Sequence, residues 1–105
     1  METMEAIQRI VAEVQTARQQ VANLKSQVQE FENTVVAIRE QPEDKAILRQ
    51  LGGVMVEVHD RKKLIEDLEH TIKLVSTSLE RIMEREQQLI EKYDELKAAL
   101  KEEKE

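Results

Sequence analysis

Few side chains in this sequence could carry out chemistry, and their spacing forms no catalytic or metal-binding pattern. The two histidines, His59 and His70, lie far apart, and His70 falls on the outer face of a helical heptad repeat. We therefore expect His70 to be a solvent-exposed surface residue rather than a metal ligand. Ser76 and Ser78 have no neighbouring base that could activate a hydroxyl group as a nucleophile.

The acidic residues and the glycines provide no better site. Pairs such as Glu84 and Glu86 are typical of a solvated helix face. A catalytic carboxyl group needs burial or a charged neighbour to shift its pKa, and two packed helices offer no cleft for that. Gly52-Gly53 lacks the Lys-Ser/Thr that completes a phosphate-binding loop, and the sequence has no cysteine. We therefore expect no enzyme, no cofactor and no metal.

The composition is typical of long helices rather than of a globular core. The chain has 105 residues, 36% of them are charged, and Phe31 and Tyr93 are the only aromatic residues. Its 16 basic and 22 acidic residues give a net charge of −6, which argues against a nucleic-acid partner. No apolar run is long enough to span a membrane, and the acidic, amphipathic N-terminus is unlike a targeting peptide. We expect a cytoplasmic protein with no membrane partner.

The first part of the chain carries the heptad repeat of a coiled coil. We expect a helix over residues 1–41 that ends near Gln41-Pro42, because proline lacks the backbone N–H and disfavours helical geometry in the residue before it. Its seam positions alternate in steps of three and four, and none is polar: Ile7, Ile10, Val14, Ala17, Val21, Leu24, Val28, Phe31, Val35 and Ile38.

A second heptad repeat predicts a helix over residues 60–101, with Asp60 as its N-cap. The tail from residue 101 to 105 has no apolar side chain and is expected to fray. If the two helices fold back antiparallel, Glu86 faces Ala17. We expect its carboxylate to turn to solvent toward Arg18, and the alternative is a weak layer where the coil bends or opens. The second seam consists of Ile65, Leu68, Ile72, Val75, Leu79, Ile82, Glu86, Leu89, Tyr93, Leu96 and Leu100.

Residues 46–58, between the helices, have the pattern of a β-hairpin. Gly52-Gly53 separates two aliphatic runs, and a Gly-Gly pair suits a type I′ turn, in which both central residues have positive φ. A lone hairpin is marginal in water and the sequence offers no third strand, so the partner strands must come from other chains. Alternation places aliphatic side chains on both faces: Ile47, Leu48, Leu51, Val54, Met55, Val56 and Val58.

Two surfaces could bind partners. The hairpin is either an assembly unit or only a connector between the helices, and its length, beyond the roughly two to eight residues of an ordinary connection, favours assembly. At the open end of the coil, Met4 and Ile7 come near Leu96 and Leu100. These side chains either become exposed by fraying and make adaptable apolar contacts, or simply form the last layers of the seam. The residues themselves do not decide between these two interpretations of the coil end.

The order of these elements resembles the β class of prefoldin subunits. The resemblance covers nearly the whole chain and is carried by Pro42-Glu43-Asp44 and by the hairpin Arg-Gln-Leu-Gly-Gly-Val-Met-Val-Glu-Val, residues 49–58, between helices of equal length. A single hairpin marks the β class, whereas the α class has two. Within the β class, residues 51–57 are most similar to the eukaryotic subunit usually numbered two.

The resemblance implies a hetero-hexamer of two α-type and four β-type chains, whose hairpins build a double β-barrel from which six coiled coils extend. The coil ends would hold unfolded clients, actin and tubulin among them in eukaryotes, without ATP and pass them to a group II chaperonin. Carried over to this chain, Met4, Ile7, Leu96 and Leu100 would hold clients. The barrel would take Ile47, Leu48, Leu51, Val54, Met55, Val56 and Val58, with Gly52 and Gly53 in the turn.

The predicted fold class is therefore mainly α: an antiparallel two-helix coiled coil with a central β-hairpin that contributes to an oligomeric β-barrel, in one domain over residues 1–105. The predicted function is that of a prefoldin subunit. The alternative is a structural coiled-coil tether or scaffold that binds no unfolded protein. Such a tether would pair its heptads between chains and would have no need of a hairpin.

Overall fold

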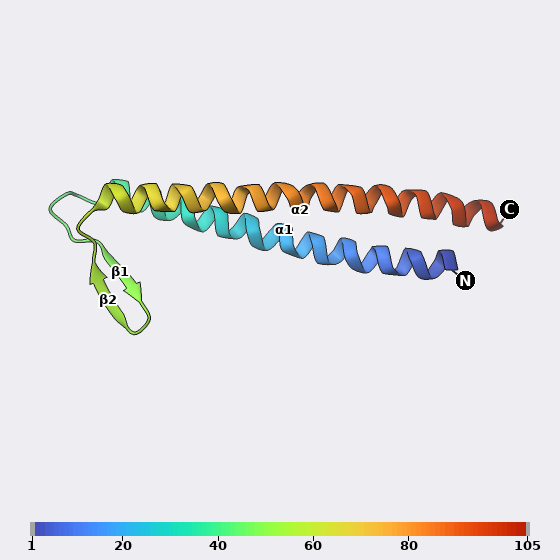
Figure 1. Cartoon of the computed structure of the whole chain (residues 1–105), viewed down its shortest axis with the longest axis horizontal. Helices are drawn as coiled ribbons and strands as arrows, with labels where there is room; N and C mark the ends of the chain where they lie inside the picture. Colours follow the sequence, from blue (N-terminus) through green and yellow to red (C-terminus); the bar gives the residue numbers. More distant parts are fainter. Residues whose placement is uncertain (1, 105) are drawn as a thin grey trace. The chain divides into compact units, whose positions relative to one another are not determined.

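The structure, a computed structural model that describes residues 2–104, has the element order helix-strand-strand-helix (Figure 1). Helix α1 spans Glu2–Glu40, strand β1 Leu48–Leu51, strand β2 Val54–Glu57 and helix α2 Arg61–Lys104. This confirms the predicted fold of the chain itself, two long helices joined by a central hairpin. Neither of the described helices has a stretch apolar enough to cross a bilayer. Residues 1 and 105, the two ends of the predicted domain, lie outside the described residues.

The sequence around the middle of the chain sets two of the helix ends. Helix α1 ends at Glu40, directly before Gln41-Pro42, as predicted. Helix α2 begins directly after Asp60, whose carboxylate Oδ1 accepts a hydrogen bond from the Lys63 backbone N–H at 2.9 Å. The predicted N-cap is therefore confirmed, because this bond satisfies one of the free N–H groups of the first turn.

The far end of α2 is longer than predicted. The helix continues past residue 101 to Lys104, so the expected fraying is wrong up to that residue. Glutamate and lysine are good helix formers, which favours continuation of the helix through the charged tail. In addition, the Thr3 hydroxyl of α1 donates a hydrogen bond to Glu103 Oε1 at 2.9 Å, which ties the tail to the start of α1.

The chain forms two compact units, and each contains a length of both helices. The first unit consists of Met1–Lys25 and Thr77–Glu105, and the second consists of Ser26–Ser76 and contains the hairpin. In the first unit the helices run antiparallel. Arg18 of α1 pairs with Glu86 of α2, whereas Thr3, earlier in α1, bonds a residue much later in α2.

The predicted seam is the apolar interior of both units. Every seam position of the two heptad repeats is buried or half-buried. The most deeply buried are Ala17, Val21 and Leu89 in the first unit and Val35 and Ile38 in the second. The spacing of apolar residues in alternating steps of three and four thus predicted correctly which side of each helix is buried.

The hairpin is a two-stranded antiparallel sheet with a well-defined register. Leu51 pairs with Val54 and Arg49 with Val56, and Val58 donates its N–H to the carbonyl of Ile47 at 2.8 Å. Directly paired residues share a face, so the register defines two faces. We call one the valine face (Ile47, Arg49, Leu51, Val54, Val56 and Val58) and the other the mixed face (Leu48, Gln50, Met55 and Glu57).

The turn differs from the predicted type. Gly52 has a φ of 60°, but Gly53 does not have a positive φ. A type I′ turn needs positive φ at both central residues, whereas a type II′ turn needs it only at the first. The turn therefore follows the type II′ pattern, and only Gly52 needs the conformational freedom of glycine. A Gly-Gly pair is compatible with either type, which is why the sequence could not separate them.

Candidate functional site

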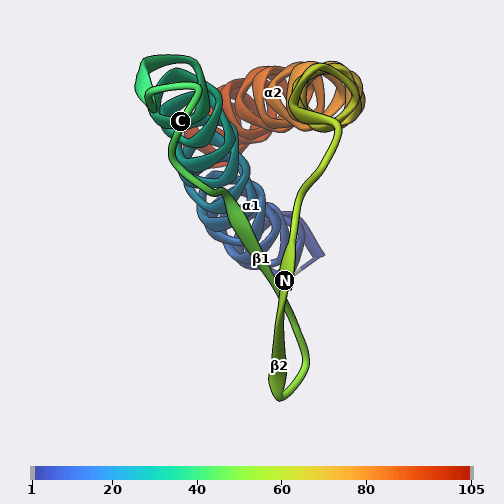
Figure 2. The ribbon, with the colours of Figure 1, turned by 90° about the vertical axis from the view of Figure 1, so that its left-hand side faces the viewer.

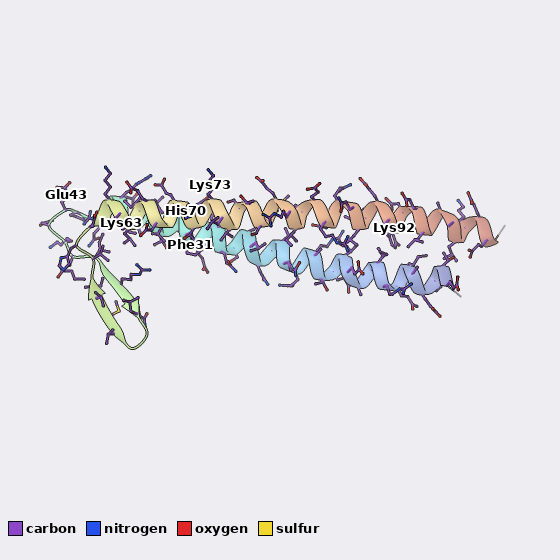
Figure 3. All side chains as sticks on the ribbon, in the orientation of Figure 1. Phe31, Glu43, Lys63, His70, Lys73 and Lys92 are labelled. Atoms are coloured by element: carbon purple, nitrogen blue, oxygen red, sulfur yellow. The ribbon has the colours of Figure 1, made fainter. Side chains whose placement is uncertain are left out.

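The residues that first suggested chemistry lie apart on the surface. His59 and His70 are both exposed. The predicted exposure of His70, which is labelled on α2 in Figure 3, is therefore confirmed. Within residues 2–104, no group of three His, Asp or Glu side chains could hold a metal ion. The features that stand out are instead the apolar side chains of the hairpin and those of the coil end.

The hairpin presents its aliphatic side chains to solvent. It projects from the neighbouring ends of the helices in its own unit, and no third strand lies beside it in the described part of the chain (Figures 1 and 2). Ile47 and Val58, at its base, are half-buried. The other aliphatic side chains are 43–61% exposed: Leu48, Leu51, Val54, Met55 and Val56. Clustered exposed apolar groups beside two open strand edges are the mark of an interaction surface.

An arginine at the start of α2 holds the base of the hairpin. The Arg61 Nη1 atom donates to the carbonyl oxygens of Gln41 at 2.6 Å and Ile38 at 3.5 Å. Its Nη2 atom donates to the carbonyl oxygens of Pro42 at 3.2 Å and Lys45 at 3.3 Å. Carbonyl groups at the end of a helix lack partners within that helix. Arg61 therefore satisfies the end of α1 and also fixes the loop that leads into β1.

Sequence reasoning missed Arg61, although a signal was present. The first turn of α2 contains Arg61, Lys62 and Lys63 and no acidic residue. Positive charge is unfavourable at the N-terminus of a helix and favourable at the C-terminus. A basic first turn thus suggests that one of its side chains serves another helix end. In the structure Arg61 serves the C-terminus of α1.

The four residues predicted to hold clients fall into two groups. Met4 is 40% exposed, whereas Ile7, Leu96 and Leu100 are half-buried in the seam. Leu100 also borders a shallow hollow of about 490 Å³ together with Ala98. The coil end therefore presents one accessible methionine and three side chains that need some separation of the helices to become fully available. Their role in client binding stays a prediction.

Two apolar side chains of the same unit that the heptad analysis left outside the seam are exposed. Val11 is 38% exposed and Met83 is 44% exposed, and both lie just outside the predicted seam. Val11, Ile90 and Tyr93 border a second hollow of about 300 Å³. This hollow and the one beside Leu100 share Asp94 in their linings, so apolar surface extends from the coil end toward Val11. The signal was the occurrence of apolar residues next to seam positions, which the heptad analysis did not count.

The charged seam position behaves as predicted. Glu86 Oε1 accepts a hydrogen bond from Arg18 Nε at 3.3 Å, and the Glu86 side chain is 22% exposed. Ala17, the neighbour of Arg18 in α1, is buried. The carboxylate therefore turns to the edge of the seam and pairs with Arg18, which confirms that interpretation.

Comparison with known proteins identifies the family. A family model described as prefoldin subunit matches residues 1–105. This chain belongs to the prefoldin family. It is 31% identical over 75 residues to prefoldin subunit beta of Thermoplasma volcanium, a match that covers 71% of this chain and 60% of the relative. The corresponding subunit of Thermoplasma acidophilum is 28% identical over 74 residues, covering 70% of this chain and 60% of the relative. The matched stretch thus spans three fifths of the length of these prefoldin relatives.

Solved prefoldin structures share the fold. The crystal structure of the prefoldin beta subunit from Thermococcus strain KS-1 aligns with a TM-score of 0.87 at 20% identity, covering 96% of this chain and 88% of that one. The beta2 subunit from the same strain aligns with a TM-score of 0.76 at 21% identity, covering 90% and 99%. The predicted resemblance to the β class of prefoldin subunits is confirmed by these relatives together.

Proposed function

We propose that this chain is a subunit of a hexameric, ATP-independent prefoldin co-chaperone. Its hairpin joins the hairpins of other subunits in a β-barrel, and its coil end holds unfolded proteins. The observation that carries the proposal is the exposure of five aliphatic side chains on a two-stranded hairpin with open edges, in a chain of the prefoldin family. An isolated hairpin of this kind gains stability only when other strands cover it.

The proposed partners are two α-type chains and further β-type chains, unfolded clients such as actin and tubulin, and a group II chaperonin, in the cytoplasm. The similarity to the eukaryotic subunit numbered two stays a prediction. We propose that the subunit works by binding alone, without a cofactor, a nucleic acid or a membrane.

Many weak apolar contacts would allow the complex to hold and release an unfolded client without ATP. A side chain such as Leu100 contributes about 1.5–3 kcal/mol if it is fully buried against a client, and partial burial reduces that. One coil end therefore binds a client weakly. Six coil ends on one platform raise the effective concentration of binding sites around a bound client. The whole complex therefore holds the client, although each single coil end releases it readily. Methionine suits such contacts because its flexible side chain adapts to different partners.

A pair of substitutions at the coil end tests the holding role. Leu96→Ser with Leu100→Ser should leave the hexamer intact and lower its suppression of aggregation of chemically denatured actin. Leu74→Ser, at a position that is 57% exposed and belongs to the unit without the coil end, is the matched control and should change nothing. Unchanged suppression by an intact hexamer that carries the double substitution would refute the assignment of the coil end.

A substitution in the hairpin tests the assembly role separately. Val54→Asp places a carboxylate on the valine face opposite Leu51, where it would be buried in a barrel without a paired charge. The variant should keep its helices, measured by circular dichroism, and fail to enter the hexamer, measured by size-exclusion chromatography. Normal entry of this variant would argue for a connector rather than an assembly unit.

A further inference from the structure

The valine face of the hairpin carries a single charge. Arg49, in β1, lies between Ile47 and Leu51 on this face and opposite Val56 of β2. Because alternate residues of a strand and directly paired residues share a face, its guanidinium belongs to an otherwise aliphatic surface. Among residues 2–104, no hydrogen bond or ion pair engages the side chain of Arg49, although its backbone is part of the ladder with β2.

The chain's own acids near this face are already engaged or point elsewhere. The valine face and the first turns of α2 border a hollow of about 320 Å³. Of the carboxylates around it, Asp60 accepts the Lys63 backbone N–H at 2.9 Å, and Asp67 pairs with the Lys63 Nζ atom at 3.7 Å. Glu57 belongs by register to the mixed face. Arg49 is exposed in the free chain, so its charge is solvated there; if a partner buried the valine face, an acid to pair with Arg49 would have to come from that partner.

We propose that the valine face docks onto the sheet face of a different chain, one that is aliphatic and carries a carboxylate to pair with Arg49. The inference rests on the proposed function, since the same hairpin is the assembly unit. Burial of a guanidinium against aliphatic groups alone is unfavourable, whereas burial against a well-placed carboxylate is tolerated. Arg49 thus selects the partner by charge as well as by shape.

The same residue opposes pairing of this chain with itself. A second copy would bring another arginine, and no acid, on its own valine face. Two like charges would then be desolvated together, which disfavours that complex. Inward-pointing charges on exposed strands are a known means of preventing unwanted strand association. Arg49 therefore acts twice, against self-association and in favour of an acidic partner.

The test compares substitutions on the two faces by light scattering, with circular dichroism as the control for folding. Arg49→Leu and Arg49→Glu change the valine face, and Gln50→Leu and Gln50→Glu make matched changes on the mixed face. Each variant is measured alone and in a mixture with the α-class and sibling β-class prefoldin chains of the same organism. Alone, Arg49→Leu should self-associate at a concentration at least about tenfold below that needed by Gln50→Leu. In the mixture, Arg49→Glu should lower the affinity for the partners by at least about tenfold more than Gln50→Glu does.

The outcomes separate the inference from the proposed function. If the wild-type chain assembles and Arg49→Glu assembles equally well, the acidic partner is ruled out while the assembly role stands. If Arg49→Leu self-associates no more than Gln50→Leu, Arg49 does not prevent self-pairing. If the wild-type chain stays alone in the mixture, the proposed function fails and the acidic partner fails with it. The comparison of the variants alone still decides whether Arg49 opposes self-association.

Discussion

The contacts of Arg61 predict that this side chain determines how firmly the hairpin base is held. Replacement by methionine keeps a long apolar stem and removes all four hydrogen bonds to Ile38, Gln41, Pro42 and Lys45. Lys62, the next residue in α2, is exposed, so Lys62→Met removes the same charge from the same helical turn without removing these bonds. The two variants therefore separate the hydrogen bonds from the charge.

The expected magnitude follows from the geometry of the four bonds. The bond to Gln41, at 2.6 Å, is charge-assisted and contributes about 1.5–3 kcal/mol. The bonds to Pro42 and Lys45, at 3.2 and 3.3 Å, contribute about 1 kcal/mol each, and the one to Ile38, at 3.5 Å, adds little. Ordering the arginine side chain costs about 1.5–2 kcal/mol. The net stabilisation is therefore about 2 kcal/mol, which corresponds to a factor of roughly 30 in the equilibrium for local opening.

Amide hydrogen exchange measures that opening directly. The Lys45 N–H bonds the Pro42 carbonyl at 3.0 Å, so its exchange reports on the loop that Arg61 holds. Arg61→Met should speed exchange of the Lys45 amide by roughly 30-fold, Arg61→Lys by less, and Lys62→Met hardly at all. Exchange of the Lys45 amide at the wild-type rate in Arg61→Met would refute the claim that this arginine fixes the loop.

Three further predictions concern the turn and the seam. Gly52→Ala should destabilise the hairpin by more than about 1 kcal/mol, because alanine is strained at a φ of 60°. Gly53→Ala should be neutral or stabilising by about 0.4–1 kcal/mol. Exchange of the β2 amides measures both effects, and equal effects would argue against the type II′ turn. Glu86→Leu should raise the free energy of unfolding by about 1 kcal/mol, because an exposed ion pair contributes little and a leucine would extend the apolar seam. Urea unfolding measures this change. A loss of stability would show that the ion pair contributes more than the leucine. Ile38→Ala, in the seam, should lower the free energy of unfolding by about 2–4 kcal/mol in a thermal unfolding experiment. Val36→Ala, at a position 51% exposed, should lower it by less than about 0.5 kcal/mol. Similar losses for the two variants would mean that the seam is misplaced.

Local signals in the sequence predicted most of the fold. Pro42 fixed the end of the first helix, Asp60 the start of the second, and the apolar period the buried side of both. Each of these depends on residues within one or two turns of each other, where propensity and steric rules act directly. The alternation around Gly52-Gly53 also predicted correctly that both faces of the hairpin carry aliphatic side chains.

The remaining features depend on geometry that no local pattern contains. Arg61 bonds carbonyl groups far away in the sequence, and only the fold brings them together. The turn type depends on the sign of φ at Gly53, which glycine adopts in either form. The tail of α2 is helical to Lys104, and Thr3 reaches it from the other helix. For the candidate site, the sequence identified the exposed hairpin residues but not the exposure of Val11 and Met83.

The central claim is that the hairpin is an assembly unit, and the mass of the complex tests it most directly. Light scattering should give the mass of a single chain for the purified protein and the mass of a hexamer for its mixture with an α-class prefoldin chain and sibling β chains. That result would leave client choice as the next question. A stable dimer that ignores the α-class chain would contradict the account, because the heptads would then pair between chains and the protein would be a tether.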